Sequence, residues 1–600
     1  EQKADFANLR ERFGETASLE AAISAEKADA DSALAKTIAA KDNYGWTKEE
    51  LLYAVSEAIV NPDPGASPQA GKANIEAARV DIDVNNAGSI GNEVDQTTYS
   101  FDDLDISTDK GLEAYKMLSR ADVSDVVWDA DNKTVTVTLK RPISIKLSGE
   151  DARIDAQAPG NVFVASDDAI PVGVVTAQGA LRLTSQKGIL AAADDSILSG
   201  GTVTLRGGAG GLGSAERALQ VNVTGADGWL ALTAQQGEYV TETDGVMRVL
   251  SAATNAEMVL AADAGVEMAE ADGALAQGVI SAESLTISVG EGGSIGTSET
   301  ALRLSGVESL TLTEGDIQGL YLDVAGGQDF TLAQAINASE GVGVHTQGSL
   351  VVEDNMSAGT GGIELQSQGA IKINDQTSLD SAADLSLTAG SDLAAQGAEL
   401  SGESIALTAE TGAVAADGAS ITAANKLDVS SKGDIGLTDA ELSTTGAAVS
   451  LSSAEGAVDL SGKSSFEAQS LTLASQEDIN LANRTIEVAE AASVASGGSV
   501  TAQGATIQAQ SLQLKAAQDV NADNAKLTAT GEMTLTAGAN LKTEAAQLSG
   551  TSVALTAETG AVAADGASIK ATTELDVSSK GDIGLAGAEL STTGAAVSLS

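Results

Sequence analysis

The sequence predicts a mostly β protein: a right-handed parallel β-helix, or solenoid, of about 21 residues per turn, preceded by a short α-helical segment. The composition is 43% hydrophobic but only 2% aromatic, with 64 Gly and 6 Pro, so small aliphatic side chains must fill a thin and uniform core. Residues 405–452 and 553–600 agree at 41 of 48 positions, at an offset of 148 residues. Within these 148 residues a shorter repeat of about 21 residues occurs seven times, once for each predicted turn of the β-helix.

The first element is a helical N-terminal segment, residues 1–61. Within it, Thr47 as N-cap and Glu50 three residues later form a capping box, which predicts a helix over 48–60. The Pro- and Gly-containing run 61–65 ends this helix.

The second element, residues 62–150, is expected to be a small mixed α/β or capping segment. Apolar spacing predicts a short helix over 108–119. A hairpin is predicted from the strands 126–128 and 133–139, which flank the turn residues 129–132.

The third element, residues 151–600, carries the β-helix repeats, with a 148-residue superrepeat over 385–532 and a partial copy over 533–600. Short strands cannot stand alone, because both their backbone groups and their apolar faces need partners. Stacking each turn on the last supplies both, with Gly or Asn at the corners. The strand openings are expected near Leu385, Ile405, Leu427, Val449, Leu471, Val494, Leu512 and Met533.

The rival all-β arrangement is a string of antiparallel sandwiches of about 100 residues each. Sandwiches need bulky aromatic residues between their sheets, and the boundaries between them are marked by Pro. The repeat region is poor in both, which favours the β-helix.

The net charge and the absence of Cys limit which partners and which chemistry are expected of the chain. The net charge of −52 repels phosphate backbones and opposes docking on anionic membranes, so no nucleic-acid partner is predicted. No stretch approaches the roughly 18 apolar residues that span a bilayer, so no membrane insertion of this segment is expected. The absence of Cys removes disulfides and thiolate chemistry. Because the chain opens with Glu1 and shows no signal peptide, it is expected to be an internal slice or a processed product.

The repeat turns SLTLTEGDI, SLTLASQEDINL, KLDVSSKGDIGL and AVSLSSAEGAVDL resemble those of filamentous haemagglutinin-like bacterial adhesins. Earlier segments resemble the leukotoxin-like filamentous adhesin branch of that family. They are GWTKEELLYAVSEAIVNPDPGA (45–66), VDIDVNNAGSIG (80–91), VVWDADNKTVTVTLKRPISI (126–145), GGSIGTSETALRL (292–304) and a second copy of the last, GGLGSAERALQV (210–221).

The resemblance implies an extracellular or cell-surface, outer membrane-associated filament that attaches to host cells, other bacteria or matrix. The implied partners are a surface glycan or protein receptor and an outer-membrane secretion partner. Two-partner-secreted members open with a domain that carries Asn-Pro-Asn-type motifs. The nearest match here is Asn61-Pro62-Asp63-Pro64, inside a helix exit, which leaves the secretion route open.

A search for reactive groups predicts no catalytic, cofactor-binding or metal site, and hence no enzyme. The single His, His345, lies in an alternating run, which is typical of a solvent-facing strand position. The adjacent acids 102–103, 167–168 and 194–195 point to opposite faces of an extended strand. The glycine-rich run 207–213 lacks the Gly-Lys-Ser/Thr ending of a phosphate loop. Weak calcium binding at acidic loops stays open.

The leading hypothesis is a β-helical adhesin stalk that mediates attachment. The C-terminal half is expected to be spacer, because recognition hot spots favour Trp, Tyr and Arg. A candidate binding surface is therefore placed within 100–250, which holds Tyr115, Trp128, Arg206, Arg217 and Trp229. Two alternatives remain open: a β-helix polysaccharide lyase or hydrolase, and a cytotoxic, leukotoxin-like passenger.

Overall fold

The computed structural model describes residues 73–100, 123–129, 132–270, 277–313, 316–594 and 597–600. The chain forms two compact units: unit 1 ends at Gly326, and unit 2 runs from Gly327 to Ser600. Within the described residues every regular element is a β-strand, and the solenoid repeats about every 21 residues, which confirms the predicted fold class. The helices expected within 1–61 and over 108–119 lie outside the described residues.

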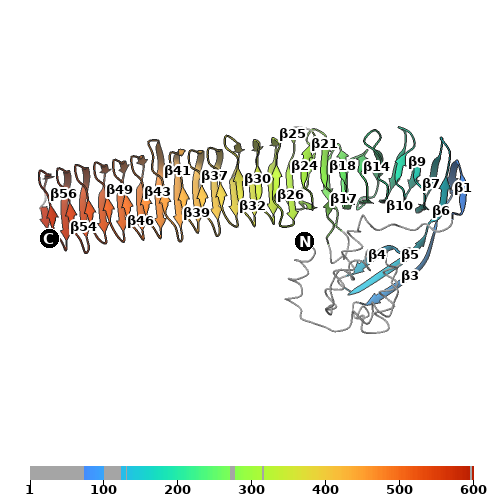
Figure 1. Ribbon diagram of the computed structural model, residues 1–600, viewed down its shortest axis with the longest axis horizontal. Coiled ribbons are helices and arrows are strands. Elements are labelled where there is room, and N and C mark those ends of the chain that lie inside the picture. Colours follow the sequence, from blue (N-terminus) through green and yellow to red (C-terminus); the bar gives the residue numbers. More distant parts are fainter. Residues whose placement is uncertain (1–72, 101–122, 130–131, 271–276, 314–315, 595–596) are drawn as a thin grey trace. The chain divides into compact units, whose positions relative to one another are not determined.

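In unit 2 each coil contributes to three ladders of parallel strands, drawn as stacked coils from yellow to red (Figure 1). One ladder is a 13-stranded sheet of very short strands. Its members are β27 (Phe330–Leu332), β30 (Leu350–Val352), β33 (Ile371–Ile373), β36 (Leu393–Ala394), β38 (Val414–Ala415), β40 (Ile435–Gly436), β42 (Val458–Asp459), β44 (Ile479–Asn480), β47 (Val500–Thr501), β50 (Val520–Asn521), β53 (Leu541–Lys542), β55 (Val562–Ala563) and β57 (Ile583–Gly584).

The other two ladders of unit 2 alternate along the chain, and in several coils one long, bent strand serves both. The long strands are β37 (Glu399–Ala409), β39 (Ser420–Ser431), β41 (Glu441–Ser453), β43 (Ser465–Ser475), β54 (Gln547–Ala557) and β56 (Ser568–Ser579). The separate strands are β28 (Ile336–Ala338), β29 (Gly341–Thr346), β31 (Met356–Ala358), β32 (Gly362–Ser367), β34 (Ser378–Ser381), β35 (Leu385–Ala389), β45 (Thr485–Val488), β46 (Ala491–Ser496), β48 (Thr506–Ala509), β49 (Ser511–Ala516), β51 (Lys526–Ala529), β52 (Glu532–Ala537), β58 (Glu589–Thr592) and β59 (Val597–Leu599).

The core of unit 2 consists of aliphatic columns, because each ladder places like residues above one another. Leu385 pairs with Ile405, 20 residues later, and Ile405 pairs with Leu427, 22 residues later; all three are buried. The predicted strand openings follow this column with one correction. The partner of Leu471 is Ala492. Val494, a larger residue, is the next inward residue of the same strand, β46, and it pairs with Leu473.

One corner of most coils of unit 2 takes the left-handed backbone conformation. Gly397, Gly418, Gly504 and Gly566 occupy it with φ between 66° and 68°. In other coils Asp439 (54°), Asn483 (61°), Asn524 (59°) and Ala545 (53°) take the same place. Glycine has no Cβ to clash there, and Asn and Asp tolerate the conformation better than other residues, which explains the Gly and Asn punctuation of the repeats.

A second corner is fastened by aspartates. The Asp434 Oδ1 accepts a hydrogen bond from the backbone N–H of Ala457 in the next coil at 2.8 Å, and Asp478 does the same for Ser499 at 2.7 Å. The residue before Ala457 is Gly456, where a Cβ would lie 2.5 Å from Asp434 Oδ1. Part of the acidic and glycine content is therefore structural.

Unit 1 is a less regular solenoid. One of its sheets, here called sheet B, is wholly parallel and pairs strands in the order given. It contains β2 (Arg79–Asp83), β7 (Arg153–Ala158), β9 (Ile170–Ala177), β12 (Ile197–Gly200), β14 (Leu219–Val223), β16 (Glu238–Glu242), β18 (Glu257–Ala262), β21 (Ser284–Val289) and β24 (Ser309–Leu312), with β11 (Ile189–Ala191) beside β9.

The remaining parallel strands of unit 1 build its other ladders. They are β1 (Ile75–Ala77), β6 (Ile143–Leu147), β8 (Val162–Ser166), β10 (Ala180–Ser185), β13 (Thr202–Gly208), β15 (Leu230–Ala234), β17 (Val246–Thr254), β19 (Gly265–Met268), β20 (Ile280–Ser281), β22 (Ser294–Ile295), β23 (Leu302–Ser305), β25 (Asp316–Ile317) and β26 (Leu320–Ala325). Parallel pairing joins β2 to β7 and β6 to β8, so the ladders begin before the boundary expected at residue 150.

An antiparallel sheet of three strands interrupts the first coils of unit 1. It pairs β3 (Asn92–Ser100) and β4 (Val123–Asp129) with β5 (Thr134–Arg141). The β4–β5 pair is the predicted hairpin. Its strands are longer than the sequence indicated, because the antiparallel pairing continues past the predicted ends of β4.

Candidate functional site

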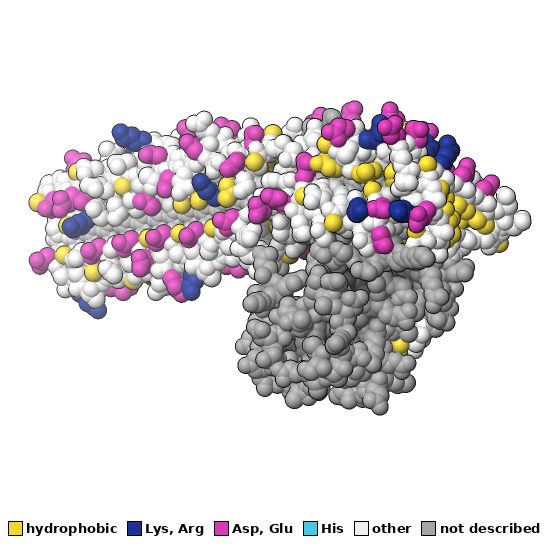
Figure 2. All heavy atoms as spheres, turned by 45° about the vertical axis from the view of Figure 1, so that its right-hand side comes forward, with side chains coloured by type: hydrophobic (Ala, Val, Ile, Leu, Met, Phe, Trp, Pro, Cys, Tyr) yellow, Lys and Arg dark blue, Asp and Glu magenta, His cyan; other side chains and the backbone are white. Residues whose placement is uncertain are grey.

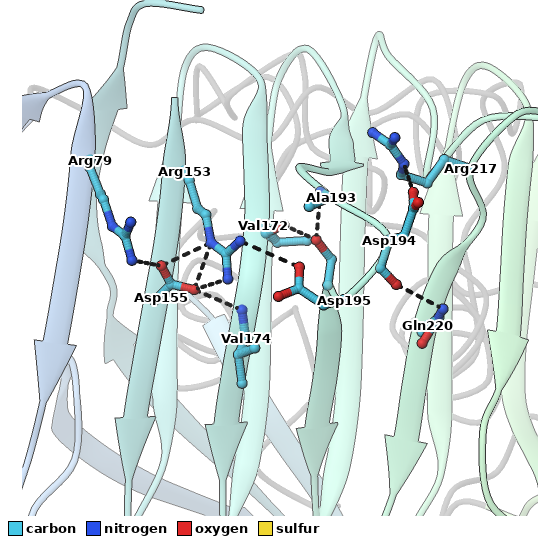
Figure 3. A network of polar contacts seen from close by, with 11 residues as sticks. Arg79, Arg153, Asp155, Val172, Val174, Ala193, Asp194, Asp195, Arg217 and Gln220 are labelled. Atoms are coloured by element: carbon cyan, nitrogen blue, oxygen red, sulfur yellow. Dashed lines mark hydrogen bonds and ion pairs between the residues drawn. The ribbon is translucent and has the colours of Figure 1, made fainter. Parts of the chain in front are cut away.

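The outer face of sheet B carries a chain of arginine and aspartate side chains, here called the arginine–aspartate network (Figure 3). It begins with a pattern shared by two paired strands: Arg79-Val-Asp81 in β2 lies in register with Arg153-Ile-Asp155 in β7. Alternation buries Val80 and Ile154 and turns the charged residues outward. The shared Arg-x-Asp pattern is the sequence signal that could have located this surface.

Asp155 is the centre of the network. Its Oδ2 lies 3.1 Å from Arg79 Nη2, and its Oδ1 lies 2.8 Å from both Nε and Nη2 of Arg153. The backbone N–H of Val174 in β9 donates to the same Oδ1 at 2.9 Å. The Asp155 side chain is only 14% exposed, so one carboxylate ties three successive strands of sheet B together.

Gly173 makes room for this arrangement. A Cβ at that position would lie 2.1 Å from Arg153 Nε and 2.2 Å from Asp155 Oδ1, much closer than atoms pack. The Arg153–Asp155 pair therefore lies across β9 where that strand has no side chain.

The network continues towards β12 and β14. Arg153 Nη1 lies 3.5 Å from Asp195 Oδ1, and the neighbouring Asp194 accepts a hydrogen bond from Arg217 Nε at 2.9 Å. Ser196, which is buried, fixes this loop by donating to the carbonyl oxygen of Val172 at 2.7 Å. The side chains of Asp195 and Asp194 are 72% and 92% exposed, so these outer pairs are solvent-screened and contribute little to stability.

The charges set the protonation state of the centre. Burial opposes ionisation of Asp155, but the hydrogen bonds from Arg153 and Val174 and the charges of Arg153 and Arg79 outweigh it and lower its pKa. The hydrogen bond to Asp155 in turn raises the pKa of Arg153. Both groups are fully ionised at neutral pH, and the network is an ion-pair lattice rather than acid–base machinery.

Exposed aliphatic side chains lie beside the network. Val174 in β9 is 40% exposed and Leu190 in β11 is 39% exposed; the other large apolar side chains left open to solvent among the described residues are Val597 and Leu599, in the last strand β59. In the space-filling view, hydrophobic side chains gather over unit 1 next to Lys, Arg, Asp and Glu (Figure 2). An apolar centre with a charged rim is the usual anatomy of a protein-binding surface.

The structure places the predicted binding residues on separate elements. Arg217 belongs to the arginine–aspartate network. Arg206 lies in β13 with its Nε buried and without a hydrogen-bond partner, and burial lowers its pKa; Trp229 directly precedes β15 and is half-buried. Trp128 lies in β4 of the antiparallel sheet, and Tyr115 lies outside the described residues. Sequence reasoning missed Arg79, Arg153 and Asp155, which the register brings together.

Unit 2 offers a different surface. Its sequence has no Trp or Tyr, and its two Phe residues, Phe330 and Phe466, are both buried. Its single Arg, Arg484, is 0% exposed. The residue types that dominate binding hot spots are thus missing from the described surface of this unit.

Reactive groups are sparse in the part of the chain that the structure describes. His345 lies in β29, where its side chain is 49% exposed and its Nε2 is 3.9 Å from Glu364 Oε1, which confirms the solvent-facing position. Asp168 pairs with Lys187 at 2.6 Å. No group of three or more His, Cys, Asp or Glu residues is placed to hold a metal ion, and no helix has the length and apolar character needed to cross a bilayer, among the described residues.

Residues 401–547 match the family model of the hemagglutinin repeat. Comparisons with curated proteins and with solved structures gave no match. The matched residues fall entirely within unit 2, in the coils between β37 and β54. The match does not reach the segments that suggested the leukotoxin-like branch, which stays a prediction. A hemagglutinin repeat carried on a parallel β-solenoid fits a filamentous haemagglutinin-like adhesin.

Proposed function

We propose that this chain is part of a secreted or surface-displayed adhesin in which unit 2 is a spacer and unit 1 attaches to a receptor through sheet B. The observation that carries the proposal is the contrast between the two surfaces. The described surface of unit 2 lacks Arg, Tyr and Trp, and its exposed large apolar side chains are Val597 and Leu599 of its last strand, whereas unit 1 exposes Val174 and Leu190 in the sheet whose strands and loops also carry Arg79 and Arg217.

A protein receptor fits this surface better than a glycan does. Aliphatic side chains contribute to binding by burying apolar area, which the hydroxyl-rich surface of a sugar offers sparingly. Arg79 and Arg217, whose side chains are 64% and 45% exposed, can each add planar donors towards carboxylates of the partner. Host cells, other bacteria and matrix all present such proteins, and an extracellular or outer membrane-associated location is part of the same proposal.

The test is an attachment assay with the full chain and its variants. Val174→Asp and Leu190→Asp place charge in the apolar centre and are expected to lower cell attachment at least tenfold, because a buried unpaired carboxylate is costly. The matched control is Thr536→Asp, on the outer face of β52 in unit 2, which should attach like the unchanged chain.

Attachment that persists in the double variant Val174→Asp/Leu190→Asp would remove sheet B from the proposal. Binding lost equally in Thr536→Asp would show that unit 2 is not mere spacer. Turnover of acidic polysaccharides, or lysis of leukocytes by the purified chain, would favour the enzyme or the cytotoxic alternative.

A further inference from the structure

Strand β16 of unit 1 carries two glutamates on its inner face. The alternation Glu238-Tyr-Val240-Thr-Glu242 points Glu238, Val240 and Glu242 inward, and the three residues are between 0% and 3% exposed. Tyr239 points outward, where its hydroxyl donates to Glu257 Oε2 at 2.8 Å. The two acids are therefore part of the packed interior, not of the acidic surface.

Both glutamates stand in columns that are otherwise aliphatic. Glu238 lies between Leu212 in the preceding coil and Met258 in the next. Glu242 lies between Val221 and Ala262 in the same way. Each carboxyl thus takes a place that neighbouring coils fill with an apolar side chain.

Neither carboxyl has a cationic partner among the described residues. Neither oxygen of Glu238 has a hydrogen bond of normal geometry, and the backbone of Ala234 favours its ionised form less than burial opposes it. Glu242 accepts only from backbone N–H groups: those of Thr243 at 3.1 Å, Val223 at 3.3 Å and Asp244 at 3.4 Å. The interior can hold the neutral acids, whereas a carboxylate there would lose its hydration and gain in return only backbone hydrogen bonds, which burial outweighs.

The charged groups on the adjoining elements do not change this conclusion. In β18, Glu257 faces outward, and in β17, Arg248 is exposed and donates to the carbonyl oxygen of Ala226. Before β14, Glu216 is exposed and Arg217 is paired with Asp194. The remaining neighbour, Asp244 in the turn after β16, is itself acidic and disfavours ionisation of Glu242.

We propose that Glu238 and Glu242 make the β14–β16–β18 region a pH-gated joint of unit 1, closed while both acids are protonated and locally opened when they ionise. The proposal does not rest on attachment to a receptor. Its effect would be to loosen one stretch of the solenoid as the pH rises, while the aliphatic columns of unit 2 stay closed.

The pH range follows from the protonation equilibria. Burial raises the pKa of Glu242 from 4.5 to about 7, and burial raises that of Glu238 well above 4.5. The folded chain therefore binds these protons more tightly than the unfolded chain. The contribution of these two acids to stability is greatest below about 4.5 and falls as the pH rises from there. For Glu242 it stops falling above about 7, once both states are ionised, and for Glu238 it falls until the pH has passed the raised folded-state pKa.

Hydrogen exchange on the full chain, measured by mass spectrometry from pH 5.5 to 9 and corrected for intrinsic exchange rates, tests the joint. The expected result is a fall of at least about tenfold in the protection of β14, β16 and β18 across this range, since one unit of pKa corresponds to a factor of ten. Strands β49 and β52 of unit 2 serve as the internal reference and should keep constant protection.

The double variant Glu238→Gln/Glu242→Gln should abolish this pH dependence, because an amide keeps the shape and cannot ionise. Glu257→Gln, which removes an outward carboxyl one strand away, should behave like the unchanged chain. Constant protection of β16 in the unchanged chain would overturn the proposal, whether or not the variants fold. An equal fall in the double variant would overturn it as well.

Discussion

Arg484 donates a hydrogen bond from Nη2 to the carbonyl oxygen of Ala440 at 2.5 Å, although 44 residues separate the two in sequence. Its Nη1 donates to Ser464 Oγ at 2.6 Å, and its guanidinium carbon lies 5.6 Å from the centre of the Phe466 ring. Arg484 follows the left-handed Asn483, a place that Ala505 and Ala525 take in the next coils. A buried arginine thus spans two coils at a position usually filled by alanine.

Replacing this arginine tests its role as a tie between coils. Arg484→Ala leaves a cavity and two acceptors without their donor, so we expect the surrounding coils to lose about 2–4 kcal/mol of stability. Hydrogen exchange of β43, β45 and β48 is the measurement. Lys515→Ala, an exposed change in the same unit, should leave these strands as they are. Unchanged protection in Arg484→Ala would show that burial of the unpaired charge cancels the gain from its contacts.

The left-handed corner of unit 2 can be tested with one matched pair of substitutions. Ala545 has φ 53°, where a Cβ is unfavourable, so Ala545→Gly should stabilise unit 2 by up to about 1 kcal/mol. Gly566 has φ 68° and open space around it, so Gly566→Ala should destabilise by about 1 kcal/mol through backbone strain alone. Urea denaturation followed by circular dichroism compares the two. Shifts of the same sign would contradict the strain argument.

Gly173 should be intolerant of any side chain. Gly173→Ala forces the Arg153–Asp155 pair off β9, and we expect it to destabilise unit 1 by about 1–3 kcal/mol. Gly327→Ala, where a Cβ meets nothing within 4 Å, is the control. Thermal unfolding of the full chain reports the difference. Equal transitions in the two variants would mean that the pair relocates freely.

Acid should weaken sheet B through Asp155. Its folded-state pKa is below the ordinary 3.8, so the ionised carboxylate stabilises the fold above 3.8, and this contribution is lost as the pH falls through the lower folded value. Hydrogen exchange of β7 and β9 between pH 5 and 2.5 measures the loss. Asp155→Asn should lower their protection at pH 5 and flatten the acid dependence, whereas an unflattened profile would assign it to other carboxyls.

The regular part of the fold follows from local pattern. In a turn such as Lys426-Leu-Asp-Val429 the alternation fixes which side chains face inward, and a nearly constant coil length then places Leu427 beneath Val449. Gly and Asn at the corners mark where the chain turns. Where one strand offers two inward residues, as β46 does with Ala492 and Val494, the sequence pattern does not decide which of them pairs with Leu471.

The candidate surface and the interior acids could not be inferred in this way. Glu238 and Glu242 alternate with Tyr239 and Thr241, and the pattern alone gives no sign that the glutamates take the inner face. Their inward orientation is decided by the stacking of coils, which places Glu238 between Leu212 of the preceding coil and Met258 of the next. Arg79 and Asp155 meet across 76 residues of sequence for the same reason.

The sequence by itself determined a coiled stack of short parallel strands, because strand alternation and turn chemistry act over a few residues and repeat with the coil. The tertiary structure decided which charged side chains became neighbours and which were enclosed. Those outcomes depend on coil lengths summed over long stretches of chain, and a difference of one residue turns a side chain to the opposite face.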